Sequence, residues 1–362
     1  MSSKPKKVAI IGSVGIPAKY GGFETLAEYL SIHLSSKVDL TVYCSSKAYP
    51  EKLKTYNNTR LRYIPLNANG AQSIPYDILS IIHAAFYAKT LLILGVSGCL
   101  ILPFVKLFTP RKIMVNIDGL EWKRNKWGKF TKKFLKLSEK MAVRYADVVI
   151  ADNLEIQRHV KNAYGKDAVL IPYGGDHTSI EKITPETLKL YPFLNENYAF
   201  KVCRIEPENN IEMILEAFSE NADLALVIIG NWNNSTFGKE MRSKYGNHNH
   251  IHLLDPIYDQ HILNEIRCAC TVYVHGHSAG GTNPSLVEAM SLGLPIFSYA
   301  VNYNKETTNN QAFYFETNSE LQALILSVKN INSKLCGKKM KIIANERYVW
   351  LKIADQYFEL IK

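Results

Sequence analysis

Short apolar runs alternate with helix-periodic segments along most of the chain. The first repeat of this pattern has an apolar run at Val8–Gly12, a Gly- and Pro-containing loop, a helical pattern at Glu24–Leu34 and a second apolar run at Leu40–Cys44. This is the β-loop-α-β signature of a parallel sheet. The same alternation predicts further strands at 61–65, 91–94, 112–117, 148–151 and 168–171.

A break then separates this set from a second one. Pro172–Gly175 interrupts the pattern, and a polar, helix-prone stretch follows it. We therefore predict two doubly wound α/β halves, a linker near Pro172–Thr178, and ligands at the carboxyl ends of the strands and between the domains. The helical periodicity of Lys338–Leu360 predicts a C-terminal helix. Strands of the second half are predicted at 198–203, 224–229, 251–253, 271–274 and 296–299.

The apolar region Leu91–Val105 invites a membrane-spanning interpretation. It is shorter than the roughly 20 residues that a spanning helix needs, and Gly95, Gly98 and Pro103 interrupt it. We interpret it as a buried strand, a glycine turn and a short helix. No apolar signal region precedes the first strand, and the six scattered cysteines lack the spacing of a zinc site, so we expect a reduced, cytoplasmic protein.

The net charge and its distribution narrow the classes of molecule that the protein is expected to bind. A chain of 362 residues suits two domains, and 43 Lys and Arg against 33 Asp and Glu give a net charge of +10, which favours anionic partners. Nine Lys or Arg and one acid, Glu139, fall between residues 123 and 144, where Phe130, Phe134, Leu137 and Met141 recur at helical spacing. Two interpretations stay open, a solvated face over a core stripe or a membrane-binding helix. Nucleic acid is disfavoured because no binding module is recognisable. The membrane interpretation assigns lipid contacts to Lys129, Lys132, Lys133 and Lys136.

The segment His275–Pro295, HGHSAGGTNPSLVEAMSLGLP, carries the clearest candidate site. Gly280 and Gly281 allow the backbone to approach a ligand, and unpaired N–H groups at the following helix start would face an anion. Glu288 lies one turn further on, within reach of a ribose hydroxyl. Without a ligand, the same letters describe an amphipathic helix between two strands of any α/β protein. The residues able to cap that helix are Thr282, Asn283 and Ser285.

Other candidates follow predicted strands. Arg204 offers a planar fork suited to phosphate oxygens, although pairing with a nearby glutamate is the structural alternative. Asp118 ends an apolar strand before Gly119, where it could contact substrate, act as a base or cap a turn. Gly21 and Gly22 stand at a helix start, where they form either a turn and N-cap or a place for close approach of a ligand. The earlier glycines at Gly12–Pro17 lack the G-x-G-x-x-G fingerprint, which argues against an NAD enzyme. His275 and His277 lack further ligands, so we expect no metal and no cofactor.

Together these segments resemble the retaining glycosyltransferases of family 4, and within them a rhamnosyltransferase-like branch. The resemblance rests on GSVGIPAKYGGFET, NIDGLEWKRNKW, GGTNPSLVEAM and RYVWLKIADQY and runs nearly end to end. The family motif is Glu, seven residues, then Glu; here Glu288 is the second and Gly280 replaces the first. Asn209 likewise stands where a lysine is usual. The donor-binding residues that the resemblance implies are Gly21, Gly22, Arg204, Asn209, His277, Gly280, Gly281, Thr282, Asn283, Pro284, Ser285, Leu286 and Glu288.

The resemblance implies a GT-B fold, with two Rossmann-like domains facing across a cleft and a C-terminal helix that crosses back to the first. We expect an acceptor domain at 1–174, a nucleotide-sugar domain at 175–340 and the returning helix at 341–362. The expected activity is sugar transfer, L-rhamnose from dTDP-rhamnose, to a lipid-linked glycan precursor at the inner face of the cell membrane, with Asp118, Arg204 and Glu288 as catalytic residues. The alternatives are a non-hydrolysing sugar-nucleotide epimerase and a catalytically silent binding subunit.

Overall fold

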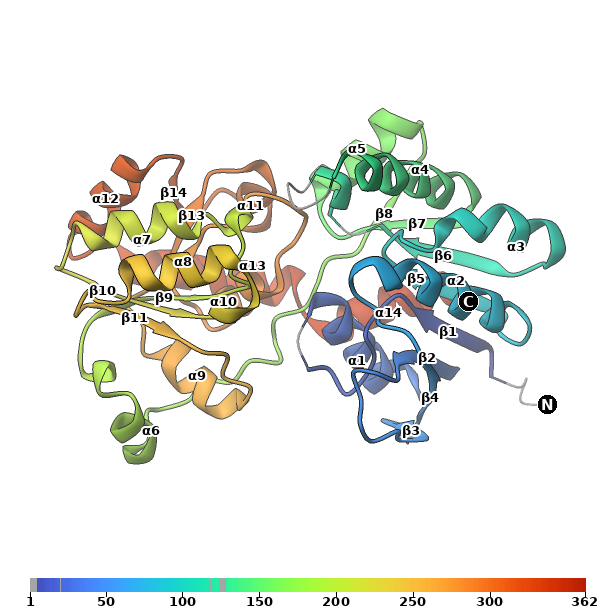
Figure 1. Ribbon diagram of the computed structural model, residues 1–362, viewed down its shortest axis with the longest axis horizontal. Coiled ribbons are helices and arrows are strands. Elements are labelled where there is room, and N and C mark those ends of the chain that lie inside the picture. The colour runs from blue at the N-terminus through green and yellow to red at the C-terminus, as the bar shows by residue number, and fades with distance from the viewer. Residues whose placement is uncertain (1–4, 20, 118, 124–127) are drawn as a thin grey trace. The chain divides into compact units, whose positions relative to one another are not determined.

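The computed structural model describes residues 5–19, 21–117, 119–123 and 128–362, which form two compact units. The first unit joins Met1–Tyr173 to the C-terminal Trp350–Lys362, and the second is Gly174–Val349. Each unit is a sheet of mainly parallel strands covered by helices (Figure 1). The predicted α/β class with two Rossmann-like sheets is therefore confirmed.

The first unit contains an eight-stranded sheet with the order β3-β4-β2-β1-β5-β6-β7-β8. All neighbouring strands are parallel except β3 and β4, which form an antiparallel pair at one edge. The chain turns from one half of the sheet to the other between β1 and β5, so loops after these strands meet at the topological switch point. The strands are β1 Lys7–Ile11, β2 Asp39–Ser45, β3 Thr55–Tyr56, β4 Thr59–Ile64, β5 Thr90–Leu94, β6 Lys112–Asn116, β7 Val148–Ala151 and β8 Val169–Leu170.

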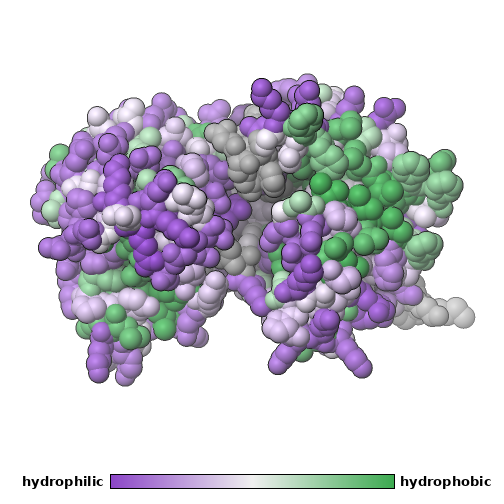
Figure 2. Space-filling view, in the orientation of Figure 1, coloured by the Kyte–Doolittle hydropathy of each residue, from purple (hydrophilic) through white to green (hydrophobic). Residues whose placement is uncertain are grey.

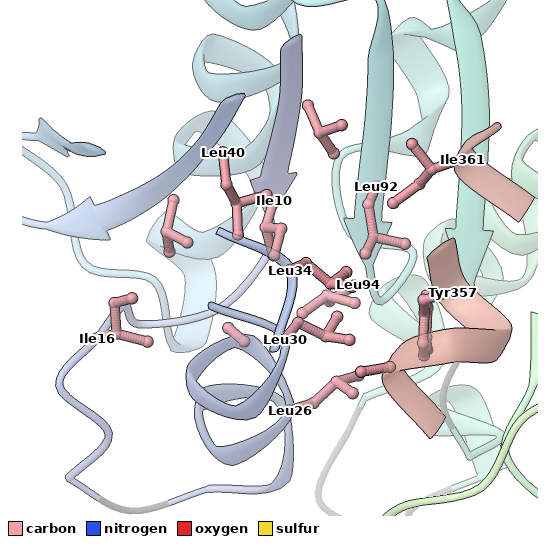
Figure 3. Packing of buried hydrophobic residues seen from close by; sticks show 14 of the residues in the cluster. Ile10, Ile16, Leu26, Leu30, Leu34, Leu40, Leu92, Leu94, Tyr357 and Ile361 are labelled. Atoms are coloured by element: carbon pink, nitrogen blue, oxygen red, sulfur yellow. The ribbon is translucent and has the colours of Figure 1, made fainter. Parts of the chain in front are cut away.

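One core of the first unit lies between its sheet, α1 and α14. Figure 3 shows Leu26, Leu30 and Leu34 of α1 with Tyr357 and Ile361 of α14, packed among strand residues. The i, i+4 and i+8 spacing of the three leucines places them on one helix face, which explains the prediction of α1 from sequence. The helices of this unit are α1 Gly22–Leu34, α2 Ser73–Ala85, α3 Leu102–Phe108, α4 Lys129–Tyr145, α5 Leu154–Tyr164 and α14 Trp350–Ile361, with 3₁₀ turns at Gly70–Gln72, Cys99–Ile101 and Glu121–Lys123.

The apolar region 91–105 folds as predicted. It forms the fully buried strand β5, a turn and the start of α3. Within the described ranges, no helix combines the length and the hydropathy that crossing a bilayer requires.

Helix α4 corrects one of the two interpretations of the basic segment. Its buried face carries Leu135, Ser138, Glu139, Ala142 and Val143. The predicted stripe is not that face, since Phe130 is 90% and Leu137 50% exposed, and Phe134 and Met141 are half-buried. The spacing is helical, but it does not mark the core side of the helix.

The second unit is a six-stranded, fully parallel sheet with the order β11-β10-β9-β12-β13-β14. Separate apolar clusters cover its two faces, as the doubly wound prediction requires. Its strands are β9 Tyr198–Val202, β10 Ala225–Ile229, β11 Ile251–Leu254, β12 Val272–His275, β13 Ile296–Tyr299 and β14 Phe313–Phe315. Its helices are α6 Pro185–Leu190, α7 Ile211–Ser219, α8 Thr236–Tyr245, α9 Gln260–Cys268, α10 Pro284–Ser291, α11 Asn302–Thr307, α12 Asn318–Ser327 and α13 Ser333–Arg347, with 3₁₀ turns at Pro192–Asn195, Pro207–Asn209 and Trp232–Asn234.

The C-terminal segment is two helices rather than the single predicted one. Helix α13 packs on α10 in the second unit, and α14 packs on α1 in the first. Tyr348 and Val349 separate them, and the Tyr348 hydroxyl donates to the Thr307 carbonyl at 2.8 Å. The return to the first unit is therefore confirmed, but it begins at Trp350 instead of residue 341.

Candidate functional site

The candidate donor site lies at the switch point of the second sheet. Strand order reverses between β9 and β12, and the loops that follow these adjacent strands are 203–210 and 276–283. Ligands of doubly wound sheets bind at such a position because two loops there diverge beyond the strand ends. The structure thus brings together two segments that are some 70 residues apart in the sequence.

Four hydrogen bonds join the two loops, and a fifth lies within the loop after β9. The Ser278 backbone N–H and hydroxyl both donate to the Glu208 carbonyl at 2.9 Å, and Asn210 Nδ2 donates to the Gly276 carbonyl at 2.8 Å. Buried Asn209 donates through Nδ2 to the Arg204 carbonyl at 2.8 Å, and its Oδ1 lies 3.0 Å from His277 Nδ1. Asn209 therefore links the loop after β9 to the loop after β12 through its side-chain amide.

Gly280 has a backbone conformation that explains the missing first glutamate of the family motif. Its φ is +125°, a region that side-chain-bearing residues rarely adopt. An added Cβ would lie 3.1 Å from Nε2 of His277, which is buried. The loop is thus shaped around glycine, and any side chain at 280 would strain it.

The loop ends in a capped helix start. Asn283 is the N-cap of α10, and its Oδ1 accepts from the Ser285 backbone N–H at 3.1 Å and from the Ser285 hydroxyl at 2.8 Å. Pro284 occupies the first helical turn, where its missing N–H costs nothing. Thr282 and Leu286 are buried and Gly281 is shielded from solvent, so these residues fix the loop. The predicted cap is therefore present, supplied by Asn283.

Glu288, one turn into α10, is held by two partners that no sequence motif singles out. Arg267 of α9 donates from Nη2 to Oε2 at 2.8 Å, and His177 Nε2 lies 3.2 Å from Oε1. Gly175 permits this approach, since a Cβ there would lie 2.4 Å from the Val287 carbonyl. Each carboxylate oxygen keeps lone pairs for a further donor.

The charge state of Glu288 follows from these partners. Burial alone would raise its pKa, but the Arg267 charge and the His177 hydrogen bond outweigh burial and lower the pKa below its ordinary value. The carboxylate is therefore ionised at neutral pH and can accept ligand hydroxyls. Arg267 is itself almost fully buried, with a 3% exposed side chain, so the pair is held in place by packing as well as by charge.

Arg204 is exposed on the loop after β9 and forms no hydrogen bond or ion pair through its side chain with any described residue. The alternative that pairs it with Glu206 or Glu208 is wrong within the described chain. Its guanidinium remains available for an anion.

Two buried basic side chains stand behind the loops. Burial lowers the pKa of Lys201 on β9. Burial and, next, the Lys201 charge hold the pKa of His275 well below its ordinary value, so the imidazole is neutral at pH 7. No cluster of three or more His, Cys, Asp or Glu side chains suited to a metal ion occurs among the described residues, His275 and His277 included.

The first unit presents its own switch-point loops. Gly21 is the N-cap of α1 with φ +137°, and Gly22 is the first helical residue. The Glu24 carboxylate folds back there and accepts from the Val14 N–H at 2.6 Å. Asp77 of α2 is buried against the Ser97 hydroxyl, and burial raises the pKa of Asp77 to about 7. The predicted catalytic residue Asp118 lies outside the described residues.

Two family models together cover most of the chain. Residues 5–176 match a family model described as a domain of unknown function (DUF1972), and residues 188–347 match the model described as glycosyl transferases group 1. The chain therefore carries a group 1 glycosyltransferase domain, the class that uses nucleotide-sugar donors, which confirms the predicted class of enzyme. A search of curated proteins found no match.

Solved structures of the same fold cover nearly the whole chain. Sucrose-phosphate synthase from Thermosynechococcus elongatus superposes with a TM-score of 0.80 at 15% identity, covering 98% of each chain. HepE from Anabaena, solved with UDP-glucose, gives 0.74 at 14% identity over 98% of this chain and 99% of that one. A Listeria monocytogenes protein described as a UDP-N-acetylglucosamine 2-epimerase gives 0.64 at 15% identity over 99% and 96%. These likenesses establish the GT-B fold.

Proposed function

We propose that the protein is a retaining glycosyltransferase that moves L-rhamnose from dTDP-rhamnose to a lipid-linked glycan precursor, working in the cytoplasm at the inner face of the cell membrane. The observation that carries the proposal is Glu288, held ionised by Arg267 beneath the capped glycine loop Gly280–Asn283. A fixed carboxylate there can accept ribose hydroxyls while loop N–H groups meet a diphosphate. HepE, of the same fold, was solved with UDP-glucose.

Catalysis would rest on position and charge. Arg204 and the amides of Gly280–Asn283 would stabilise the departing nucleotide diphosphate, as preorganised donors do where charge develops. With Asn209 in place of the usual lysine, Arg204 carries this charge in the loop after β9. Asp118 would hold or deprotonate the acceptor hydroxyl. Gly21 and Gly22 would bring the start of α1 close to donor and acceptor.

The lysines of α4 would bring the protein to its acceptor. Lys129, Lys133 and Lys136 are exposed along the helix, and Lys132 is half-buried. Each well-placed cation adds about 1 kcal/mol of attraction to an anionic membrane surface. A lipid-linked acceptor is presented at that surface.

The deciding experiment incubates the protein with dTDP-, UDP- and GDP-sugars and lipid-linked acceptors, and measures the nucleotide diphosphate released. Release that requires an acceptor and is largest with dTDP-rhamnose supports the proposal. Interconversion of sugar nucleotides without an acceptor identifies an epimerase, the activity named for the Listeria protein. Nucleotide binding without turnover identifies a silent subunit. Glu288→Gln, which keeps the side-chain shape, is the matched control.

A further inference from the structure

Helix α3 presents apolar side chains to solvent. Leu102 and Val105 face the core, whereas Phe104, Leu107 and Phe108 are 59%, 74% and 75% exposed. These three residues have i, i+3, i+4 spacing and so share one helix face. Soluble surfaces rarely gather large apolar side chains in this way, and such patches mark interaction sites.

Neighbouring helices enlarge this surface. On α2, Leu79 and Ile82 are exposed and Phe86, at its C-cap, is 80% exposed. Helix α3 packs directly on α4, and the 3₁₀ turn Cys99–Ile101 contacts α2, α3 and α4. The space-filling view shows hydrophobic surface gathered over this part of the first unit (Figure 2).

The exposed apolar residues of α4, Phe130 and Leu137, continue the same surface. Glu139 points to the other flank of α4, where it contacts His159 and Tyr164 of α5 at 2.9 and 2.7 Å. Phe130 and Leu137 project about half a turn of the helical wheel away from Glu139. Helix α3 is a direct neighbour of α4. The apolar surface therefore runs from α2 across α3 to α4.

Positive charge borders the apolar surface. The exposed face of α4 that adjoins the stripe carries five cations and no exposed acid, since Glu139 is buried. An exposed apolar stripe beside a row of cations is the pattern of helices that lie in a membrane interface. The exposed cations are Lys129, Lys133, Lys136, Lys140 and Arg144.

We propose that this surface inserts into the headgroup region of an anionic phospholipid bilayer, with the apolar side chains entering the acyl boundary and the α4 cations contacting lipid phosphates. This inference rests on the proposed function. It adds insertion of apolar side chains to the electrostatic attraction proposed there. Two signals of different kind are what stable peripheral binding requires, because either alone is weak and reversible. The surface, called the apolar face below, consists of Leu79, Ile82, Phe86, Phe104, Leu107, Phe108, Phe130 and Leu137.

The test separates apolar insertion from charge. Cosedimentation uses phosphatidylcholine vesicles with and without phosphatidylglycerol, at low and high salt. Replacing Phe104, Leu107 and Phe108 together with Ser should weaken partitioning at least about tenfold at both salt concentrations, because insertion of apolar groups is not screened. Replacing the four lysines 129, 132, 133 and 136 with Gln should weaken it only at low salt and only on anionic vesicles. The matched control replaces exposed apolar residues of the second unit, Ile180, Leu190 and Leu326, with Ser and should bind like wild type.

Insertion is measured directly with Leu107→Trp. The emission of the introduced indole should shift to the blue and be quenched by brominated lipids, whereas Leu190→Trp in the second unit should show neither change. Unchanged partitioning of the folded triple Ser variant, or an indole signal in Leu107→Trp that brominated lipids leave unquenched, would overturn the proposal. A concentration-dependent dimer in light scattering that the triple variant abolishes would instead assign the apolar face to a second copy of the chain, which also overturns it.

Failure of the proposed function has a different signature. Calorimetry with dTDP and UDP reports the donor site, which the Ser variants leave intact. A protein that inserts into vesicles but binds no nucleotide overturns the glycosyltransferase proposal alone. One that binds nucleotide but not vesicles overturns insertion alone.

Discussion

At the scale of single residues, Glu288 depends on a partner remote in sequence. Glu288→Ala should abolish measurable donor binding while the unit stays folded, because each hydrogen bond from a ribose hydroxyl to a carboxylate contributes about 1.5–3 kcal/mol. Arg267→Met should weaken binding too and also lower the free energy of unfolding by about 3–5 kcal/mol, since it leaves a largely buried carboxylate without its cation. Titration calorimetry with nucleotide diphosphate, beside chemical denaturation, measures both. Wild-type affinity in folded Glu288→Ala would place the donor elsewhere.

Arg204 is the second residue whose role can be isolated. Arg204→Ala should reduce kcat by about one hundred to one thousand fold, the scale for loss of a preorganised charge stabiliser. Arg204→Lys should recover only part of that, because an ammonium lacks the planar fork. Since the side chain has no partner among the described residues, unfolding should be unaffected in both. Steady-state kinetics of both variants measure kcat. Full activity of the Ala variant would show that Arg204 does not stabilise the leaving group.

Asp77 makes the stability of the first unit depend on pH. Burial raises the pKa of Asp77 to about 7, above its value in the unfolded chain, so the folded state binds the proton more tightly. The contribution of protonated Asp77 to the free energy of unfolding is fully present below the pKa of Asp77 in the unfolded chain. It is lost as pH rises through about 7. Relative to wild type, Asp77→Asn should therefore gain stability between pH 4 and 8, by on the order of 3 kcal/mol. Denaturation across that range tests the sign, and a difference that is constant with pH would contradict it.

At the scale of elements, the loop between β12 and α10 is built for glycine. Gly280→Glu restores the letters of the family motif but places a side chain at φ +125° and close to His277. We expect it to cost about 1–3 kcal/mol of stability and to weaken donor binding rather than improve it. Gly280→Ala should show only the loss of stability that comes from placing a Cβ at this backbone conformation. Calorimetry of both variants checks this, and tighter nucleotide binding by Gly280→Glu would refute the explanation from backbone conformation.

The sequence predicted helices and strands better than it predicted which side chains contact the site residues. Strands and helices such as β5, α1 and α10 were foreseeable because apolar periodicity and caps are local signals. His177 and Arg267 were not, since they reach Glu288 from a loop and a helix far along the chain and follow no motif. The stripe of α4 was found, but only one of the two interpretations left open placed it in the core, because a period reveals that residues share a face and not what covers that face.

The prediction of a single C-terminal helix was wrong for a related reason. Helical periodicity continues through residues 338–360, although the chain leaves the helix at Tyr348 to bond Thr307. Only the tertiary hydrogen bond and the burial of Trp350 in the other unit reveal the break. The roles of all the predicted site residues, Gly21, Gly22 and Asp118 included, stay predictions.

At the scale of the whole molecule, the C-terminal crossing makes the first unit depend on the last residues of the chain. Helix α14 buries Trp350, Ile353, Ala354, Tyr357 and Ile361 in the core that the first unit forms with α1. Trp350 stacks on Tyr29 with ring centroids 4.8 Å apart, and the Tyr357 hydroxyl accepts from Asn116 Nδ2 at 3.0 Å. The core of the first unit is thus completed by a helix that is synthesised after the whole second unit.

Deletion of residues 350–362 should therefore unfold the first unit and spare the second. Burial of a large apolar side chain contributes about 1.5–3 kcal/mol, so losing four of them removes an amount comparable to the roughly 5–15 kcal/mol stability of a whole domain. The second unit keeps its own core, including α13. Hydrogen exchange should lose protection in β1, β5 and α1 but retain it in β9 and β12. Tyr357→Phe, which removes only the bond to Asn116, should keep protection in both units. Equal loss of protection in the two sheets after the deletion would mean that they fold as one cooperative body.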